Sequence, residues 1–189
     1  MGKNTTLFWQ LVEREHEKAR AYCYRLSGGG EDGDDLYQEA VLAAYRGFAG
    51  LRQTTSFRPW FYRIINNRYK ARFRSPWWRR ILSLLPEHEE ISPSENPSAL
   101  YEARRRLRKA FEVLSADDRI LVTLAELEGW KISELAKLTS KTEGNIKMRL
   151  SRARKKMRRR LAAFYRGKAS GDYTQRIDKI CVVTKPEKD

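Results

Sequence analysis

Residues 126–157 read Glu-Leu-Glu-Gly-Trp-Lys-Ile-Ser-Glu-Leu-Ala-Lys-Leu-Thr-Ser-Lys-Thr-Glu-Gly-Asn-Ile-Lys-Met-Arg-Leu-Ser-Arg-Ala-Arg-Lys-Lys-Met and carry the clearest helical pattern of this 189-residue chain. The first part is amphipathic, with an apolar side made by Ile132, Leu135, Ala136 and Leu138. This pattern ends at the polar residues 139–141, and a second helix begins after Thr142, whose hydroxyl is a good N-cap. The stretch therefore predicts two helices joined by a short turn.

The second of these helices has two opposite faces. Apolar residues recur at i, i+4, i+7 and i+11, at Ile146, Leu150, Ala153 and Met157. At about 100° per residue, the opposite face is basic along much of its length and small near its start, which suits a major groove. We interpret the stretch as a helix-turn-helix whose candidate DNA-contacting residues are Thr142, Asn145, Lys147, Met148, Ser151, Arg152 and Lys155. On periodicity alone, a helical hairpin with a solvated basic face is the alternative.

The same stretch resembles region 4 of bacterial sigma factors of the extracytoplasmic-function (ECF) group. The resemblance rests on Leu-Glu-Gly-Trp, then Glu-Leu-Ala, then Gly-Asn-Ile-Lys-Met-Arg-Leu-Ser-Arg-Ala-Arg-Lys. It implies that this part reads the minus-thirty-five promoter element. Lys131, Ser140 and Lys141 depart from the family pattern, which usually has a serine N-cap, a turn glycine and an apolar residue there. Asn145 and Met148 replace threonine and serine, so the family's base preference does not carry over.

The charge balance of the chain points to a polyanionic partner. Lys and Arg number 39 against 24 Asp and Glu, a net charge of +15. A membrane-surface protein could show the same balance, but no apolar run reaches the roughly 18 residues of a span and no signal peptide is present. We expect a cytoplasmic protein without membrane insertion.

Few residues of the chain suit catalysis or metal binding. The cysteines are Cys23 and Cys181, the histidines are His16 and His88, and these four do not form a metal-ligand spacing or a nucleophilic triad. The glycines 28–30 follow a helix and precede acidic residues, so they predict a turn rather than a phosphate loop. The sequence thus predicts no catalytic residue, no metal and no cofactor.

The first part of the chain predicts a helix over 6–27 and a second helix from Asp34, after a loop from Ser27 to Gly33. The second helix has an inward face that includes Tyr37, Val41 and Tyr45, and an acidic outward stripe. By itself that stripe favours a solvated surface. However, Asp-Leu-Tyr-Gln-Glu-Ala followed by Ala-Tyr-Arg-Gly-Phe resembles region 2 of the same sigma family, which docks on core RNA polymerase. The resemblance implies polymerase binding by Asp35, Leu36, Gln38, Glu39 and Leu42.

A third helix is predicted over 57–74, with Ser56 as its cap and aromatics interleaved with arginines. This combination binds single-stranded DNA, because bases stack on aromatic or guanidinium planes while phosphates are neutralised alongside. Most of the aromatics also fit a core. The motif Ser-Phe-Arg-x-Trp-x-Tyr-Arg-Ile-x-x-Asn resembles the part of sigma region 2 that melts and reads the minus-ten element. The polar residues expected to be exposed for that task are Arg63, Asn66, Asn67, Lys70 and Arg74.

We therefore predict an all-α chain of two small helical domains. Residues 1–75 form a sigma region 2-like domain, 76–99 a flexible acidic linker rich in Pro, Ser and Glu, and 100–165 a region 4-like helix-turn-helix domain. The tail 166–189, which holds Cys181, has no assigned role.

The expected function is that of a non-enzymatic sigma factor. It would bind core RNA polymerase and promoter DNA, in duplex and single-stranded form, and the resemblance allows an anti-sigma factor as a further partner. A stand-alone helix-turn-helix regulator is the first alternative, but it would need neither the acidic stripe nor the aromatic-basic helix. A nucleic-acid enzyme is the second, and the sequence lacks a carboxylate cluster to hold Mg²⁺ for it.

Overall fold

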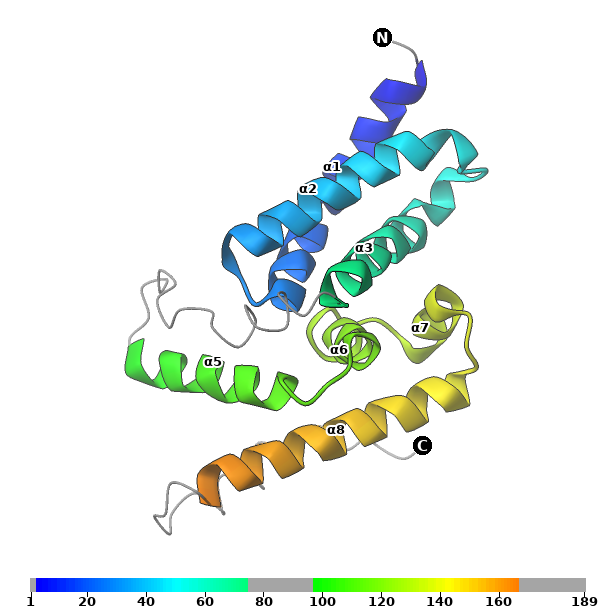
Figure 1. Cartoon of the computed structure of the whole chain (residues 1–189). Helices are drawn as coiled ribbons and strands as arrows, with labels where there is room; N and C mark the ends of the chain where they lie inside the picture. Colours follow the sequence, from blue (N-terminus) through cyan, green and yellow to red (C-terminus); the bar gives the residue numbers. More distant parts are fainter. Residues whose placement is uncertain (1–2, 75–96, 167–189) are drawn as a thin grey trace.

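The computed structural model describes residues 3–74 and 97–166, which are helical almost throughout (Figure 1). The helices are α1 (Lys3–Ser27), α2 (Gly30–Gly47), α3 (Phe57–Phe73), α5 (Pro97–Phe111), α6 (Ala116–Val122), α7 (Ile132–Thr139) and α8 (Glu143–Arg166). Shorter turns are η1 (Phe48–Gly50), η2 (Thr54–Ser56) and the π-helical turn η3 (Thr123–Leu127). The predicted all-α fold is confirmed over these residues. The predicted linker and tail lie almost wholly outside them.

The reversal between α1 and α2 is shorter than the sequence predicted. Gly28, Gly29 and Gly30 have φ angles of 90°, 105° and 62°, a region that glycine enters without steric cost. The chain therefore turns within three residues, and α2 begins at Gly30 rather than at Asp34. Gly33 lies inside α2 against α1, where an added Cβ would be 2.9 Å from the Tyr24 Cα. The glycine predicted to belong to a loop instead permits close contact between two helices.

An aromatic core holds α3 against α1 and α2. Phe8, Phe61 and Ile65 are fully buried, and the rings of Phe57 and Phe61 stack at 5.6 Å. Ser56 precedes α3 as predicted, but its side chain makes no capping hydrogen bond. The prediction that Tyr45 faces inward is wrong, because it is 46% exposed near the end of α2, where only one side of its ring packs against Phe8 at 5.3 Å.

The remaining helices pack around α8, and their buried residues join those of α1, α2 and α3 in one hydrophobic cluster. Ile146, Leu150 and Ala153 are at most 1% exposed, which confirms the register predicted for this helix. On α7, Leu135 is fully buried against the same core. The Ser115 hydroxyl accepts a hydrogen bond of 3.2 Å from the Asp118 N–H, so α6 begins at a serine N-cap. Figure 1 shows α6 and α7 between α3 and α8, so they connect the two parts of this cluster.

The turn between α7 and α8 contains two of the departures from the family pattern. Ser140 has φ 54° and ψ 44°, the left-handed conformation that glycine usually occupies. The Lys141 N–H closes the turn on the Ala136 carbonyl at 3.0 Å. At the other end of α7, the Glu134 carboxylate accepts from the Lys131 N–H at 2.7 Å, so half of a capping box survives the loss of the serine.

The strained backbone at Ser140 makes a substitution there informative. We expect Ser140→Gly to raise the free energy of unfolding by about 0.5–1 kcal/mol, because a left-handed residue with a Cβ costs about 1–2 kcal/mol and the extra freedom of unfolded glycine offsets part of it. The matched control is Ser151→Gly, at an exposed position inside α8, which should lose about 0.5 kcal/mol. Urea denaturation followed by circular dichroism measures both. A lower free energy of unfolding in both variants would show that the backbone at Ser140 is not strained.

Candidate nucleic-acid interface

The residues predicted to read the minus-thirty-five element lie on α8 and on Thr142, the residue just before it. Met148 is 43% exposed, and Asn145 is the one partly covered residue of the set. Thr142 also caps the helix, because its hydroxyl accepts from the Asn145 N–H at 3.3 Å. The exposed members are Thr142, Lys147, Met148, Ser151, Arg152 and Lys155.

Other cations of α8 are paired with carboxylates of their own domain. A guanidinium nitrogen of Arg149 lies 2.8 Å from Asp118, and Arg154 Nε donates to Glu126 at 3.0 Å. The ammonium of Lys156 lies 3.7 Å from Asp118. Among the described residues, the outward cations Lys147, Arg152 and Lys155 form no such ion pair. The helix therefore presents its uncompensated charge on the face predicted for DNA.

The polar residues of α3 divide into an exposed group and one buried residue. Arg63, Asn67 and Arg74 are exposed and Lys70 is half-buried. The prediction that Asn66 is exposed is wrong: it is 5% exposed, and its side-chain oxygen accepts from the Tyr22 hydroxyl at 2.7 Å. Asn66 follows Tyr62 by four residues on the helix face that packs on α1, and this spacing could have identified it as a core residue.

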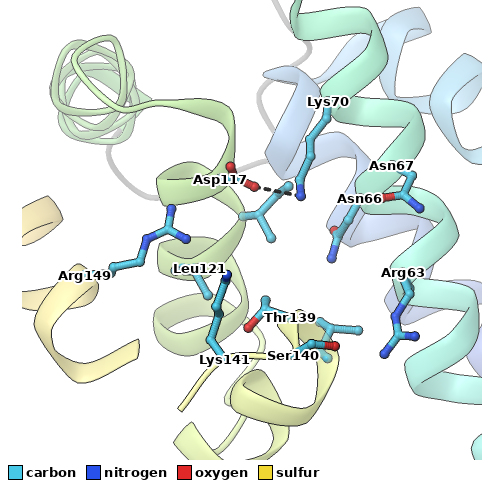
Figure 2. A pocket seen from close by; sticks show the side chains of 12 residues that line it. Arg63, Asn66, Asn67, Lys70, Asp117, Leu121, Thr139, Ser140, Lys141 and Arg149 are labelled. Atoms are coloured by element: carbon cyan, nitrogen blue, oxygen red, sulfur yellow. Dashed lines mark ion pairs between the residues drawn. The ribbon is translucent and has the colours of Figure 1, made fainter. Parts of the chain in front are cut away.

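Arg63, Asn67 and Lys70 of α3 line a cleft of about 340 Å³, to which the edge of Asn66 also contributes (Figure 2). The opposite wall is made by α6 and by the turn after α7, with Leu121 and Ser140 among its lining residues. Lys70 crosses the cleft to Asp117, with 2.7 Å between Nζ and a carboxylate oxygen. The sequence held no signal that these distant segments would face each other.

On α2, four of the five predicted docking residues share the outer surface. Asp35, Gln38, Glu39 and Leu42 are exposed. The assignment of Leu36 to this surface is wrong, because its side chain is fully buried. Successive residues of a helix point about 100° apart, so Leu36, which follows Asp35 of the stripe, points into the core. Glu39 is not free either, since its carboxylate accepts from Arg72 of α3 at 2.6 and 3.2 Å.

A shallow apolar groove of about 390 Å³ adjoins this stripe. Gln38 and Leu42 form one side, and Trp9 of α1 forms part of the other. Trp9 is 50% exposed and stacks on Tyr45, with ring centroids 6.2 Å apart. Sequence reasoning missed Trp9, although a tryptophan on the polar side of a helix is a signal for an interface.

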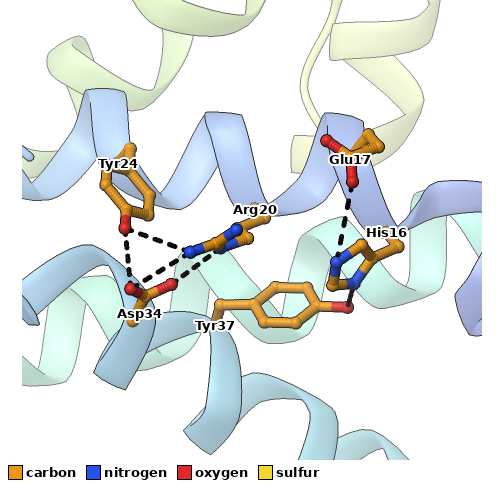
Figure 3. A network of polar contacts seen from close by, with 6 residues as sticks. All are labelled: His16, Glu17, Arg20, Tyr24, Asp34 and Tyr37. Atoms are coloured by element: carbon orange, nitrogen blue, oxygen red, sulfur yellow. Dashed lines mark hydrogen bonds and ion pairs between the residues drawn. The ribbon is translucent and has the colours of Figure 1, made fainter.

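Polar contacts between α1 and α2 set which side of α2 points outward (Figure 3). Asp34 accepts from Arg20 Nε at 2.8 Å and from the Tyr24 hydroxyl at 2.7 Å. The hydrogen bonds from Arg20, which has the larger effect, and from Tyr24 hold the pKa of the Asp34 carboxyl below its usual value. Nearby, the imidazole Nδ1 of His16 is hydrogen-bonded to the Tyr37 hydroxyl at 2.8 Å, and burial raises the pKa of Tyr37 to about 12.

Two further properties bear on the possible chemistry of the described residues. Over 3–74 and 97–166, His, Cys, Asp and Glu do not gather in any group of three or more that could hold a metal ion. In the same ranges, no helix combines the length and the apolar character that crossing a membrane requires.

Comparisons with known proteins match both parts of the chain. The model of Sigma-70 region 2 matches residues 11–79, and that of Sigma-70, region 4 matches residues 104–157. The chain is 32% identical over 155 residues to the ECF RNA polymerase sigma-E factor of Escherichia coli (strain K12), covering 76% of this chain and 81% of that protein. It is 29% identical over 154 residues to ECF RNA polymerase sigma factor SigM of Mycobacterium tuberculosis (strain ATCC 25618 / H37Rv), covering 82% and 76%.

Solved structures share the fold. The sigma factor RpoE from Bartonella quintana, in complex with the anti-sigma factor NepR, superposes with a TM-score of 0.60 at 24% identity, covering 82% of this chain and 96% of that one. CnrH, in complex with the cytosolic domain of CnrY, gives a TM-score of 0.57 at 24% identity, covering 86% and 89%.

Asn66 and Asn67 are adjacent residues with different roles, which their alanine variants should separate. We expect Asn66→Ala to lower the free energy of unfolding by about 1–3 kcal/mol, because the buried Tyr22 hydroxyl loses its acceptor. Asn67→Ala should change it by less than about 0.5 kcal/mol, because Asn67 is exposed. Thermal and urea unfolding of the two purified variants measures the difference, and equal losses would contradict the buried position of Asn66.

Proposed function

Since this chain belongs to the ECF RNA polymerase sigma factors, which bind core RNA polymerase and promoter DNA to start transcription, we propose that its exposed faces divide that work. One face docks on the polymerase, one binds the melted minus-ten strand, and one reads the minus-thirty-five duplex. The family supplies these tasks without catalysis by the sigma subunit, and we propose that this chain is likewise no enzyme and works in the cytoplasm, where polymerase is found.

The proposed polymerase-docking face consists of Asp35, Gln38, Glu39 and Leu42 on α2, extended by Trp9 on α1. Its support is an exposed leucine and an exposed tryptophan beside acidic side chains on a strongly basic protein. Aromatic and apolar anchors ringed by polar groups are the usual centre of a protein interface. A stand-alone helix-turn-helix regulator would have no use for this face, so it favours the sigma function over that alternative.

The proposed minus-ten face consists of Arg63, Asn67 and Lys70 on α3 and of Arg74, the residue that caps its C-terminus. The position of these four residues supports the proposal, because they lie on one side of a helix whose opposite side packs in an aromatic core. Cations and an amide in this arrangement can hold phosphates and the edge of an unstacked base. Asn66 has no part in this face, because its side chain is committed to Tyr22.

The proposed minus-thirty-five face is the outward side of α8. Its support is the separation of charge on this helix: the flanking cations are paired with Asp118 and Glu126, whereas Lys147, Arg152 and Lys155 point away from the core. Helix-turn-helix proteins place such a face in the major groove. An anti-sigma factor, which is the partner of the Bartonella protein, is a proposed further partner for this chain.

The match of the chain to both sigma regions is the observation that carries this function. Reconstitution tests it directly: purified protein is combined with core RNA polymerase and a library of promoter fragments, and transcripts are mapped. We expect transcripts whose start sites share a two-part upstream sequence. Transcripts no different from those of core polymerase alone would refute the function.

The docking face predicts a specific effect at Leu42. We expect Leu42→Asp to weaken binding to core polymerase at least tenfold, which corresponds to about 1.4 kcal/mol, because a charge replaces a central apolar contact. Leu107→Asp makes the same change at a leucine of α5 that is 46% exposed, and it should leave binding unchanged. Fluorescence titration of labelled protein with core polymerase measures both affinities. Equal weakening by the two variants would place docking elsewhere.

The outward face of α8 predicts a difference between base readers and phosphate anchors. Arg152→Ala should cost about 1–3 kcal/mol at one promoter position, because an outward guanidinium reaches base edges. Lys156, at the flank, is 55% exposed and only distantly paired with Asp118, at 3.7 Å, so it can reach a phosphate. Lys156→Ala should therefore weaken all sequences alike and reduce the salt slope by roughly one. Selection from a promoter library at two salt concentrations measures both effects. The reverse pattern would mean that the two residues have exchanged roles.

A further inference from the structure

The C-terminal half of α8 carries two cations that lie outside the proposed minus-thirty-five face. Arg158 and Arg159, here called the arginine pair, are both exposed, and within the part of the chain that the structure describes neither forms an ion pair. After Glu143, the helix has no carboxylate of its own. An anion that neutralises this pair must therefore come from outside α8.

Neighbouring helices do neutralise other cations of the same half. Glu112 of α5 lies 3.0 Å from a guanidinium nitrogen of Arg160, which directly follows the arginine pair. Arg154, one turn earlier, donates to Glu126 at 3.0 Å. The fold thus supplies carboxylates on the sides of α8 that face other helices, and it leaves the arginine pair without one.

The packing of α5 on α8 fixes the direction of the arginine pair. Figure 1 shows α5 beside the C-terminal half of α8. Besides the pair of Glu112 with Arg160, the Arg105 guanidinium lies 5.7 Å from the Phe164 ring, and that of Arg106 lies 5.7 Å from the Tyr165 ring. These contacts hold one side of α8 against α5, so the arginine pair, which is exposed, points away from it.

Arg159 continues the outward row of α8 at helical spacing. That row runs through Met148, Arg152 and Lys155. Arg159 lies about 17 Å along the helix axis from Met148, at 1.5 Å per residue. The major groove is only about 12 Å wide, and such helices contact base edges with their N-terminal residues. When the first turns of α8 lie in the groove, Arg159 is therefore beyond its edge, where the accessible groups of DNA are backbone phosphates.

The stability of the helix does not account for these cations. Arg158 and Arg159 follow Lys155 by three and four residues, and like charges at these spacings destabilise a helix. The helix dipole favours cations only in the last turn, whereas the arginine pair lies about two turns before the end of α8 at Arg166. A polyanion along this side of the helix would relieve the repulsion.

We propose that Arg158 and Arg159 form a second DNA site on α8, which binds backbone phosphates of the duplex beside the minus-thirty-five element and is independent of base sequence. The site lengthens the contact with duplex DNA beyond the groove that the first turns of α8 occupy. It adds affinity that falls with salt and adds no preference for particular bases. This inference rests on the proposed function of α8.

The test is the salt dependence of duplex binding by the full chain. The double variant Arg158→Gln/Arg159→Gln removes both charges and keeps long polar side chains. Fluorescence anisotropy measures its affinity for a fluorescein-labelled random-sequence duplex of about 30 base pairs, roughly three helical turns, over a series of salt concentrations. We expect the slope of log affinity against log salt to shrink by roughly 1.8, which is 0.9 for each lost phosphate contact.

The matched control is Arg14→Gln/Lys18→Gln, which removes two exposed cations four residues apart on α1 and so gives the same net charge. Its salt slope should equal that of the parent protein. Circular dichroism should show unchanged helicity for both variants, because the substituted residues are exposed. In a promoter-library selection, the arginine-pair variant should prefer the same bases as the parent, since phosphate contacts carry no sequence information.

Three results would overturn the proposal: a salt slope of the arginine-pair variant equal to that of the parent, an equal decrease in the α1 control, or a changed base preference. An unchanged slope with weaker binding to core polymerase would assign the pair to a protein partner instead. Promoter-dependent transcription separates this inference from the proposed function. Transcription with an unchanged slope refutes only the phosphate site, whereas a smaller slope without promoter-dependent transcription refutes only the sigma function.

Discussion

The attachment of α3 to the aromatic core is the constraint on which the rest of the structure depends. Phe61 and Ile65 fix the rotation of this helix about its own axis, and the hydrogen bond from Tyr22 to Asn66 fixes it again through a polar contact. Once that rotation is set, Arg63, Asn67 and Lys70 can point only toward the second unit or toward solvent. The same core orients α2, so the faces proposed for docking and for the minus-ten strand lie on one helical unit.

Charge is distributed so that this basic protein can fold and still offer cations to DNA. With a net charge of +15, the basic side chains of a compact chain repel one another. Acidic residues on neighbouring helices reduce this repulsion where they form ion pairs. Asp118 and Glu126 neutralise the flanks of α8, and Glu39 neutralises Arg72 beside α2. Among the described residues, the cations on the outward face of α8, Lys147, Arg152 and Lys155, form no such ion pair. Asp117 differs from the other carboxylates because its partner, Lys70, lies on a face proposed to bind DNA.

The departures from the family pattern change local stability more than architecture. Ser140 adopts the left-handed conformation in spite of its Cβ, because the turn closes through the Lys141 N–H and the core residues on both sides over-determine the path. At Lys131, the Glu134 side chain supplies a capping hydrogen bond from within the helix. The helix-turn-helix is thus kept by its buried apolar stripe, and caps and turn residues adjust how stable it is.

The sequence by itself determined the all-α class, the helix-turn-helix register and the faces of α8, because helical periodicity is local and Ile146, Leu150 and Ala153 repeat along one side. Through family resemblance it also named residues of α2 and α3 that are mostly exposed in the structure and that we propose as the docking and minus-ten faces. It misplaced Leu36 and Asn66, since a motif match names positions but not the direction of each side chain. Only the tertiary structure decided that Gly33 belongs in a helix, that Asn66 belongs to the core, and that Lys70 meets Asp117. Each of these depends on segments distant in sequence, and local periodicity carries no information about which distant group will lie within a few ångströms.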